Sequence, residues 1–395
     1  MRLLDKIIFL CLFFGLLFVS LNRHSRHPIF DYHSQLFADK AGYHIYSAAF
    51  FYYDMDASKL PADIVVKTGN GFRTVENKII TKYPIGVAIC QTPFFGVAAL
   101  YDKVMGNNEN AGFTEAHHIA LNWSTAIWGI IGLLLIFLTA IRFWDLSYSK
   151  AYLLIVLLLF ASNLLYYMTR DCGMSHTYSF TVFAVIQYII LNCFRKARIR
   201  GIDIIGLLLL LSLVIVLRPL NLVFIFLPLL FIIWSNNGKI KDVKLDVKWF
   251  NALLGVMLAL IPIALQLGYN YYAYGMLFAD SYGNETFSNL GSLDLLALWF
   301  APNNGVLLYS PVLVLMIIGA VYQLKQGNSK ILLYLFYFLV ISFTYAAWWS
   351  PELGCGFGHR GFTEHMAFFA LPIALLLGAL SKPFTKLLWV LAVVV

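Results

Sequence analysis

Carboxylates are sparse in this sequence, and Asp39 is placed where one could act as an acid or a base. The sequence after it, from Gly42 to Tyr46, is typical of the start of a helix. Asp39 could therefore cap that helix or be a surface charge, or it could be a general base that takes a proton from an acceptor hydroxyl. Asp54 and Asp56 are spaced like a DxD metal motif, but we interpret them as part of a turn.

Three arginines, Arg170, Arg218 and Arg360, lie in short connections that hold no other basic residue. Arginine binds phosphate through two parallel hydrogen bonds, so phosphate binding is one interpretation of Arg218 and Arg360. A snorkelling side chain or an ordinary salt bridge is the other. Arg170 is followed by Asp171, which makes phosphate binding less favoured there.

Polar and aromatic residues gather in two connections, one from about 268 to 305 and one from 348 to 360. This combination suits stacking on a sugar ring, although aromatic residues also form belts at membrane interfaces. Four glycines between 354 and 361 suit either an anion site made of backbone N–H groups or a tight turn. The residues that we interpret as candidate substrate contacts are Tyr43, His176, Tyr282, Asn284, Glu285 and His359.

Metal and disulfide chemistry have less support in the sequence. The histidines show no compact ligand spacing such as HExxH, so we assign no metal site and no cofactor, and a divalent metal remains an option. The five cysteines form no CxxC pair. A bridge between Cys172 and Cys355 stays open.

The segments that must position these residues are strongly apolar. Hydrophobic residues make up 61% of the chain and charged residues 12%, against about 45–50% and about 25% in soluble domains. Apolar runs of about 20 residues recur, and backbone polar groups in lipid must bond within helices. The fold class is therefore all-α integral membrane: one domain over residues 1–395, a polytopic bundle of about eleven transmembrane helices. The expected spans are an N-terminal helix to Leu21, Ile119–Ile141, Ala151–Met168, His176–Phe194, Ile202–Leu217, Leu220–Trp234, Trp249–Leu267, Val306–Tyr322, Ile331–Ala347, Phe362–Leu380 and Leu387 to the end.

Both ends of the chain allow two interpretations. The N-terminal run could be a signal peptide, but it lacks a small-residue cleavage site and is followed by Asn22, Arg23 and His24, so we expect an uncleaved helix. The last span begins near Leu387 and stops at Val395, short of the roughly 20 residues that cross a bilayer. Either the chain is truncated there or this helix ends inside the membrane.

Basic residues predict the orientation of the bundle. With the N-terminus in the cytoplasm, the N-terminal segment and alternate connections hold sixteen of the 28 Lys and Arg residues, and the opposite short connections hold three. Because basic residues favour the cytoplasmic side, we expect a multi-pass protein of the plasma (inner) membrane. The formal charge of +8 is spread over short connections rather than one soluble face, which argues against a nucleic-acid partner.

A first outer loop of residues 22–118 follows the N-terminal helix. Its segment 84–104 is apolar and long enough to span, but a span there would place the basic clusters 195–200 and 239–248 outside. We therefore expect a helix that lies at the membrane interface and is interrupted by Pro93.

The order of these features resembles the C-type superfamily of membrane glycosyltransferases, particularly the branch of the protein mannosyltransferases and the bacterial aminoarabinose transferase. In the family's motifs, an acidic pair corresponds to Asp39-Lys40 here, and the Lys-Pro-Pro of the aminoarabinose transferase corresponds to Lys82-Tyr83-Pro84. The matching elements are Asp39-Lys40-Ala41-Gly42-Tyr43, Lys82-Tyr83-Pro84, Glu115 and Arg218-Pro219-Leu220-Asn221.

The resemblance implies that the chain transfers a sugar from a polyprenyl-phosphate carrier to a hydroxyl of a glycan, lipid or protein acceptor. Transfer would take place on the outer face of the membrane with inversion at the anomeric carbon, and membrane lipids would surround the bundle. Asp39 would deprotonate or orient the acceptor. Lys82, Arg218 and Arg360 would stabilise the charge that grows on the departing phosphate.

Two other functions stay open. A polysaccharide polymerase or ligase also uses outer-face arginines but acts on diphosphate-linked glycans. A transporter or flippase of lipid-linked glycans would be favoured by inverted repeats and by broken helices near the bilayer midplane. The sequence shows no convincing internal repeat, whereas Pro219, Pro228 and Pro262 could break helices.

Overall fold

Long apolar helices dominate the structure, a computed structural model that describes residues 2–107, 109–236, 241–283, 285–354 and 356–394. In this part of the chain, five segments are long and apolar enough to cross a membrane: α1 (Leu3–His24), α5 (Glu115–Phe143), α8 (Ser175–Lys196), α12 (Trp249–Tyr274) and Ser329–Ala346, which contains α16 (Leu332–Ala346). Five shorter apolar helices accompany them: α6 (Tyr148–Phe160), α9 (Gly201–Leu217), α10 (Asn221–Ser235), α15 (Val312–Lys325) and α17 (Met366–Ala379). The predicted helical, multi-pass membrane fold is confirmed.

Each of the eleven expected spans overlaps a helix, but some of them are divided. The expected span 151–168 consists of α6 and α7 (Leu164–Thr169), and the expected span 306–322 consists of α14 (Val306–Tyr309) and α15. The number of bilayer crossings stays a prediction, because several of these helices are shorter than the roughly 20 residues that cross a bilayer. Outside the first loop, the other described helices are α13 (Leu295–Phe300), α18 (Lys382–Val394) and the 3-10 helices η2 (Ser329–Ile331) and η3 (Arg360–Phe362).

Small residues allow the central helices to pack closely. Gly132 of α5 faces α8, where a Cβ atom would lie 2.6 Å from the ring of Phe180. Gly319 of α15 faces α17, where a Cβ atom would lie 2.2 Å from the carbonyl oxygen of Pro372. Membrane helices commonly approach one another through such small residues, because the gain from packing must replace the hydrophobic effect.

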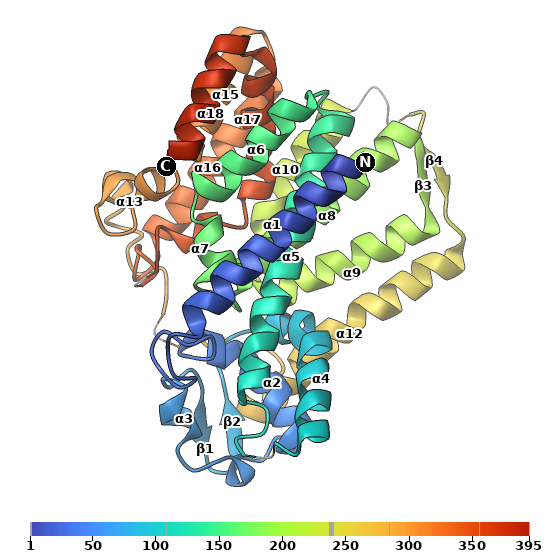
Figure 1. Cartoon of the computed structure of the whole chain (residues 1–395). Coiled ribbons are helices and arrows are strands. Elements are labelled where there is room, and N and C mark those ends of the chain that lie inside the picture. Colours follow the sequence, from blue (N-terminus) through green and yellow to red (C-terminus); the bar gives the residue numbers. More distant parts are fainter. Residues whose placement is uncertain (1, 108, 237–240, 284, 355, 395) are drawn as a thin grey trace.

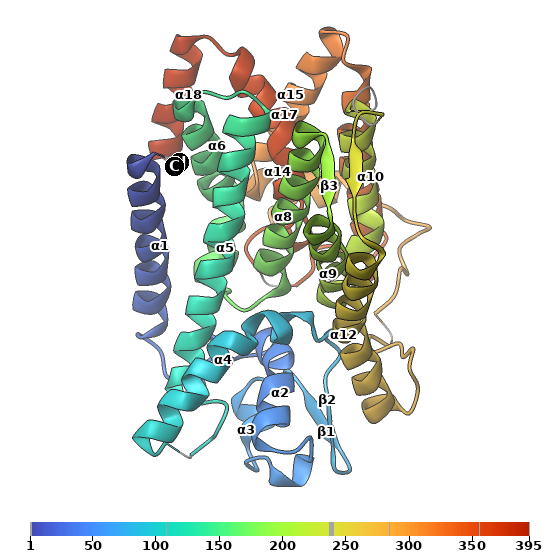
Figure 2. The same cartoon turned by 90° about the vertical axis from the view of Figure 1, so that its right-hand side faces the viewer.

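The first loop folds into a layer at one end of the bundle, at the bottom of Figures 1 and 2. A short hairpin in this layer pairs its two strands antiparallel, with Arg73 opposite Ile80 and Val75 opposite Lys78. The elements of the layer are α2 (Asp39–Tyr52), the 3-10 helix η1 (Ala57–Lys59), α3 (Ile64–Lys67), β1 (Arg73–Val75), β2 (Lys78–Ile80) and α4 (Gly86–Met105).

Prolines do not end the helices in which they lie. The helix α4 continues through Pro93, so the predicted interruption at this residue is wrong. The helices α10 and α12 likewise continue through Pro228 and Pro262, and Pro219 lies in the turn between α9 and α10. A proline removes one backbone donor, but an apolar surrounding offers the remaining backbone groups no partner outside the helix. Figure 2 shows α4 running obliquely across the lower part of α5, against which it packs.

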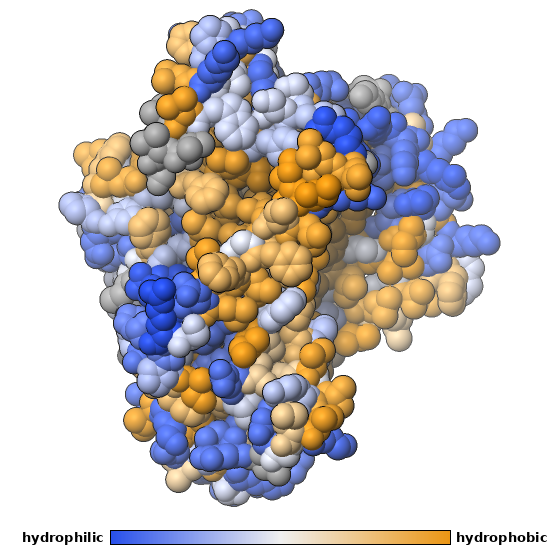
Figure 3. All heavy atoms as spheres, in the orientation of Figure 1, coloured by the Kyte–Doolittle hydropathy of each residue, from blue (hydrophilic) through white to orange (hydrophobic). Residues whose placement is uncertain are grey.

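The two ends of the bundle differ in charge. Figure 1 shows the α5–α6, α8–β3, α15–α16 and α17–α18 connections at the upper end, away from the first loop. Here β3 (Arg198–Arg200) pairs in parallel with β4 (Lys244–Asp246), which joins two basic connections. Hydrophobic residues cover the middle of the face seen in Figure 3, and hydrophilic residues gather mainly towards its ends. The predicted basic connections therefore share one end, and which end faces the cytoplasm stays a prediction.

The cysteine prediction stays untested. Cys172 is buried, and its Sγ donates to the Oδ1 of Asn122 over 3.0 Å. Cys355 lies outside the described residues, so the structure gives no information on a bridge between Cys172 and Cys355.

Candidate active site

Asp39 is the first residue of α2 and faces the interior of the molecule. Its Oδ1 accepts a hydrogen bond from the hydroxyl of Tyr83 over 2.5 Å, and its Oδ2 accepts one from the Nη1 of Arg360 over 2.9 Å. The carboxylate therefore bonds to these two side chains and not to the backbone N–H groups at the start of α2. The residue before it, Ala38, has φ +52° and accordingly turns the chain sharply into the helix.

The surroundings of Asp39 keep it ionised. Burial alone would raise the pKa of its carboxyl group, but the guanidinium of Arg360, the hydroxyl of Tyr83 and the ammonium of Lys82 outweigh burial and lower the pKa below its ordinary value. Asp39 is thus a carboxylate at neutral pH and can accept a proton. About a third of its side chain, 32%, remains exposed.

Arg218 directly follows α9 and lies in a cluster of buried polar groups. Its Nη1 lies 3.0 Å from the Oε1 of Glu364, and its Nη2 donates to the hydroxyl of Tyr345 over 3.2 Å. The other oxygen of Glu364, Oε2, lies 2.7 Å from the Nδ1 of His176. With a proton on this Nδ1, His176 donates to the fully buried carboxylate that pairs with Arg218. The Nη1 of Arg218 lies 2.9 Å from the same Nδ1 and donates to it in the other tautomer of the ring.

Lys82 follows β2 and approaches the same region from the first loop. Its Nζ forms a 2.5 Å ion pair with the Oε1 of Glu285 and lies 5.7 Å from the ring centroid of Tyr282. Ser281 donates to the carbonyl oxygen of Lys82 over 2.8 Å and ties the loop after α12 to the first loop. The side chains of Lys82 and Glu285 are 36% and 26% exposed, so this ion pair is accessible to a ligand.

One cavity of about 590 Å³ brings most of the predicted site residues together. Asp39, Lys82, Arg218 and Arg360 line it, although they come from segments far apart in the sequence. Of the predicted substrate contacts, Tyr43, His176, Tyr282 and Glu285 line the same cavity. Its apolar wall consists of Leu220, Val223, Phe287, Trp348, Trp349 and Leu353.

One of the predicted contacts, His359, is not among the described residues that line this cavity. His359 is buried, and its Nε2 lies 2.7 Å from the carbonyl oxygen of Pro351, which fixes the connection between α16 and η3. Asn284 lies outside the described residues.

The sequence reasoning did not identify Glu364 or Tyr83. Glu364 lies in the expected span Phe362–Leu380, and an ionisable residue in such a span is itself a sign of function. Tyr83 stands beside Lys82 in the sequence, and only the fold shows that its hydroxyl reaches Asp39. Lys40, the neighbour of Asp39, forms a 3.1 Å ion pair with Asp171.

The possible metal ligands lie apart from the cavity of about 590 Å³. Asp56 accepts from the backbone N–H of Ser58 over 2.9 Å, and Asp54 pairs with Lys59, so the DxD-like stretch forms the expected turn. A different group, His27, Asp31 and His33, has ligand atoms within 4.8 Å of one another in the segment between α1 and α2.

The fold is similar to that of a solved membrane glycosyltransferase of the C-type superfamily, ArnT from Cupriavidus metallidurans in the apo state. The TM-score is 0.55 at 10% sequence identity, over 98% of this chain and 62% of ArnT, so the chain spans less than two thirds of that protein. This likeness confirms the expected fold.

Two further similarities are weaker. The oligosaccharyltransferase AglB from Archaeoglobus fulgidus, in complex with an inhibitory peptide and a dolichol-phosphate, gives a TM-score of 0.48 at 11% identity, over 99% of this chain and 52% of AglB. An oligosaccharyltransferase of the same organism in the apo form gives 0.46 at 10%, over 95% of this chain and 50% of the other. No protein-family model matches the sequence, and no curated protein matches it significantly.

Proposed function

We propose that this protein is a membrane glycosyltransferase that moves a sugar from a polyprenyl-phosphate carrier to an acceptor hydroxyl. One observation carries the proposal: a carboxylate and three cations, Asp39, Lys82, Arg218 and Arg360, line a single cavity that also has an apolar and aromatic wall. A carboxylate suits the acceptor hydroxyl, the cations suit the phosphate, and the apolar wall suits a prenyl chain and a sugar ring.

The reaction is a displacement at the anomeric carbon of the donor sugar. The acceptor oxygen forms a bond to this carbon, the bond from the carbon to the phosphate oxygen breaks, and polyprenyl phosphate leaves with the bonding electrons. The acceptor hydroxyl loses its proton to the carboxylate of Asp39, which is ionised and accessible for this purpose. Attack opposite the leaving group inverts the configuration of the carbon.

The cations differ in how free they are to contact the phosphate. Lys82 is held by Glu285 and Arg360 is held by Asp39, so each would have to share or change its partner. Arg218 is anchored on one side by Glu364, while 21% of its side chain stays exposed and lines the cavity. Arg218 is therefore the principal phosphate contact of the proposal, and the other two cations add to the stabilisation of the leaving group.

The proposal places the cavity on the outer side of the plasma (inner) membrane, with the N-terminus in the cytoplasm. The support for this orientation is the gathering of the basic connections at the end of the bundle away from the first loop. The partners are a polyprenyl-phosphate-linked sugar, a glycan, lipid or protein acceptor, and membrane lipids.

The test uses the purified full chain in lipid nanodiscs, supplied with radiolabelled polyprenyl-phosphate sugar and an acceptor extract. We expect label to move to acceptor with the wild type and with the control Asp54→Asn, whose carboxylate is exposed in the same loop. Asp39→Asn should abolish transfer while the protein elutes as the wild type does. Full transfer by Asp39→Asn would remove Asp39 from the role of base.

The same assay separates the alternatives. A preference for a diphosphate-linked glycan over the monophosphate would favour a polymerase or ligase. Movement of the lipid-linked sugar across a vesicle membrane without covalent transfer would favour a flippase, for which the unbroken helices α10 and α12 provide no support.

A further inference from the structure

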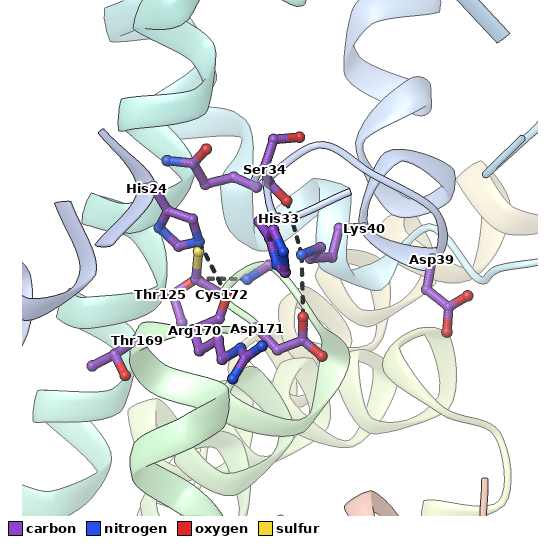
Figure 4. A network of polar contacts seen from close by, with 12 residues as sticks. His24, His33, Ser34, Asp39, Lys40, Thr125, Thr169, Arg170, Asp171 and Cys172 are labelled. Carbon is purple, nitrogen blue, oxygen red and sulfur yellow. Dashed lines mark hydrogen bonds and ion pairs between the residues drawn. The ribbon is translucent and has the colours of Figure 1, made fainter. Parts of the chain in front are cut away.

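A second cavity, of about 260 Å³, lies beside the first one. Asp39, Arg360 and Gly354 line both cavities, so the ion pair between Asp39 and Arg360 stands between them. The other walls of the second cavity come from the end of α1, from the segment that leads into α2, and from the turn after α7. Figure 4 shows part of this region, with Lys40 between Ser34 and Asp171, and Asp39 apart from that pair.

Two arginines of the second cavity have no anionic partner in the described part of the chain, and the guanidinium of Arg170 lies 5.4 Å from the ring centroid of Tyr166. Arg23 and Arg170 both line it, and within the described parts of the chain neither guanidinium forms a hydrogen bond or an ion pair. The Nε atom of Arg23 is buried without an acceptor. The other cation of this wall, Lys40, is in contrast satisfied by the carbonyl oxygen of Ser34 at 2.9 Å and by Asp171 at 3.1 Å.

Such an arrangement has a free-energy cost for the protein without a ligand. The buried Nε of Arg23 is unfavourable without an acceptor, and the exposed guanidinium of Arg170 adds a repulsion that water screens in part. An oxyanion would relieve both effects, because the planar guanidinium binds phosphate or carboxylate through two parallel hydrogen bonds. Arg170 also lies at the end of the bundle where basic residues are few outside the first loop.

The position of the second cavity fits one of the two substrates. In an inverting displacement, the acceptor approaches the anomeric carbon from the side opposite the leaving phosphate. The first cavity holds Arg218 and the apolar wall that suit the donor, and the second reaches Asp39 without them. Its aromatic side chains, Tyr32, Phe37 and Tyr166, suit the ring of a sugar.

We propose that the second cavity binds the acceptor, and that this acceptor carries a phosphate or carboxylate group held by Arg23 and Arg170 near the hydroxyl that reacts. The inference rests on the proposed function and narrows its acceptor to an anionic compound. The anion could belong to a lipid head group or to a glycan, and the experiment distinguishes the two sources.

The test measures equilibrium binding of glucose 6-phosphate, with glucose as the neutral control, to the full chain in phosphatidylcholine nanodiscs. The variant is Arg23→Gln with Arg170→Gln, and the matched control is Arg26→Gln, an exposed arginine that does not line the second cavity. Wild type and control should bind glucose 6-phosphate at least tenfold more tightly than the double variant does, because two charge-assisted contacts are lost. Glucose 6-phosphate binding that is no tighter than glucose binding, or that is unchanged in the double variant, would overturn the inference.

Two further arms make the result specific. Anionic phosphatidylglycerol in the nanodisc should compete with glucose 6-phosphate if a lipid head group supplies the anion, and should leave binding unchanged if a glycan supplies it. Binding of polyprenyl phosphate should persist in the double variant and weaken in Arg218→Gln. If polyprenyl phosphate does not bind the wild type at all, the proposed donor fails, whereas the loss of sugar-phosphate binding still reports on Arg23 and Arg170 separately.

Folding of the variants is controlled by their elution and by thermal unfolding in the same nanodiscs. Arg170→Lys should recover part of the affinity, because it restores the charge without the two parallel hydrogen bonds. The opposite result has two parts: Arg170→Lys recovers no affinity for glucose 6-phosphate, and the folded double variant binds it as the wild type does. This result would show that neither arginine takes part in ligand binding.

Discussion

Glu364→Gln should destabilise the folded protein strongly, although the new side chain has nearly the same shape. Glu364 is fully buried and is the counter-charge of Arg218, and its second oxygen accepts from His176. Glutamine keeps one oxygen for Arg218 but places an NH₂ group opposite the Nδ1–H of His176. The substitution therefore leaves a buried cation without its anion, and in the tautomer with a proton on Nδ1 it also sets two donors against each other.

The magnitude follows from the exposure of the two partners. Removing one member of a buried ion pair costs about 3–5 kcal/mol. Because 21% of the Arg218 side chain is exposed towards the cavity, water relieves part of this cost. We therefore expect the lower end, about 3 kcal/mol, which changes the ratio of folded to unfolded protein by more than a hundredfold.

The assay is reversible unfolding of the purified protein in mixed micelles with increasing denaturing detergent. Glu352→Gln is the control, because its exposed side chain should change the free energy of unfolding by less than about 0.5 kcal/mol. The double variant Glu364→Gln with Arg218→Gln should be destabilised by less than the sum of the single variants. Equal stability of the two glutamate variants, or strict additivity in the double variant, would refute the idea that Glu364 compensates Arg218.

Two further predictions concern the charge on Asp39 and the packing of the bundle. Since Arg360 lowers the pKa of Asp39, transfer should decline in acid only at lower pH than an ordinary aspartate would require, and Arg360→Gln should move this acidic limb to higher pH in a pH–rate profile of the residual activity, because burial then dominates. An unmoved limb would contradict this account. Gly132→Ala should lower the free energy of unfolding by about 1–3 kcal/mol, since its Cβ would lie 2.6 Å from Phe180, whereas the control Gly96→Ala meets no atom within 4 Å. Equal unfolding curves for the two glycine variants would argue against this tight contact.

Periodicity and apolar content predicted most of the bundle, because lipid leaves the backbone few alternatives to a helix. They could not predict where one apolar run divides into two helices. The break between α6 and α7 occurs at Ser162 and Asn163, where the Oγ of Ser162 bonds to the carbonyl oxygen of Leu158 and accepts from the N–H of Leu164. Asn163 donates to the carbonyl oxygen of His359, almost two hundred residues away, and such a partner cannot be read from a run of apolar residues.

The charged residues of the first cavity were predictable one at a time but not as pairs. Arg218 and Arg360 stood out because they lie where basic residues are rare, and Asp39 stood out because it begins a helix beyond the first span. Their partners depend on the fold: Arg360 meets Asp39 across 321 positions of the sequence, and Arg218 meets Glu364. The uneven distribution of basic residues shows that these arginines need an explanation. Only the tertiary structure shows which carboxylate each of them pairs with.

Asp39-Lys40 stands where the glycosyltransferases that this chain resembles carry an acidic pair, and this difference illustrates the same point. The two side chains point to different surroundings, and Lys40 bonds to Ser34 and Asp171 while Asp39 bonds to Tyr83 and Arg360. An acid at position 40 would meet Asp171 at close range, and two adjacent carboxylates resist ionisation. Lys40 and Asp171 therefore belong together, and their ion pair neutralises one wall of the second cavity. With lysine at position 40, the carboxylate of Asp39 has no acidic neighbour in the sequence. Hydrogen bonds from Arg360 and Tyr83 hold this carboxylate in place.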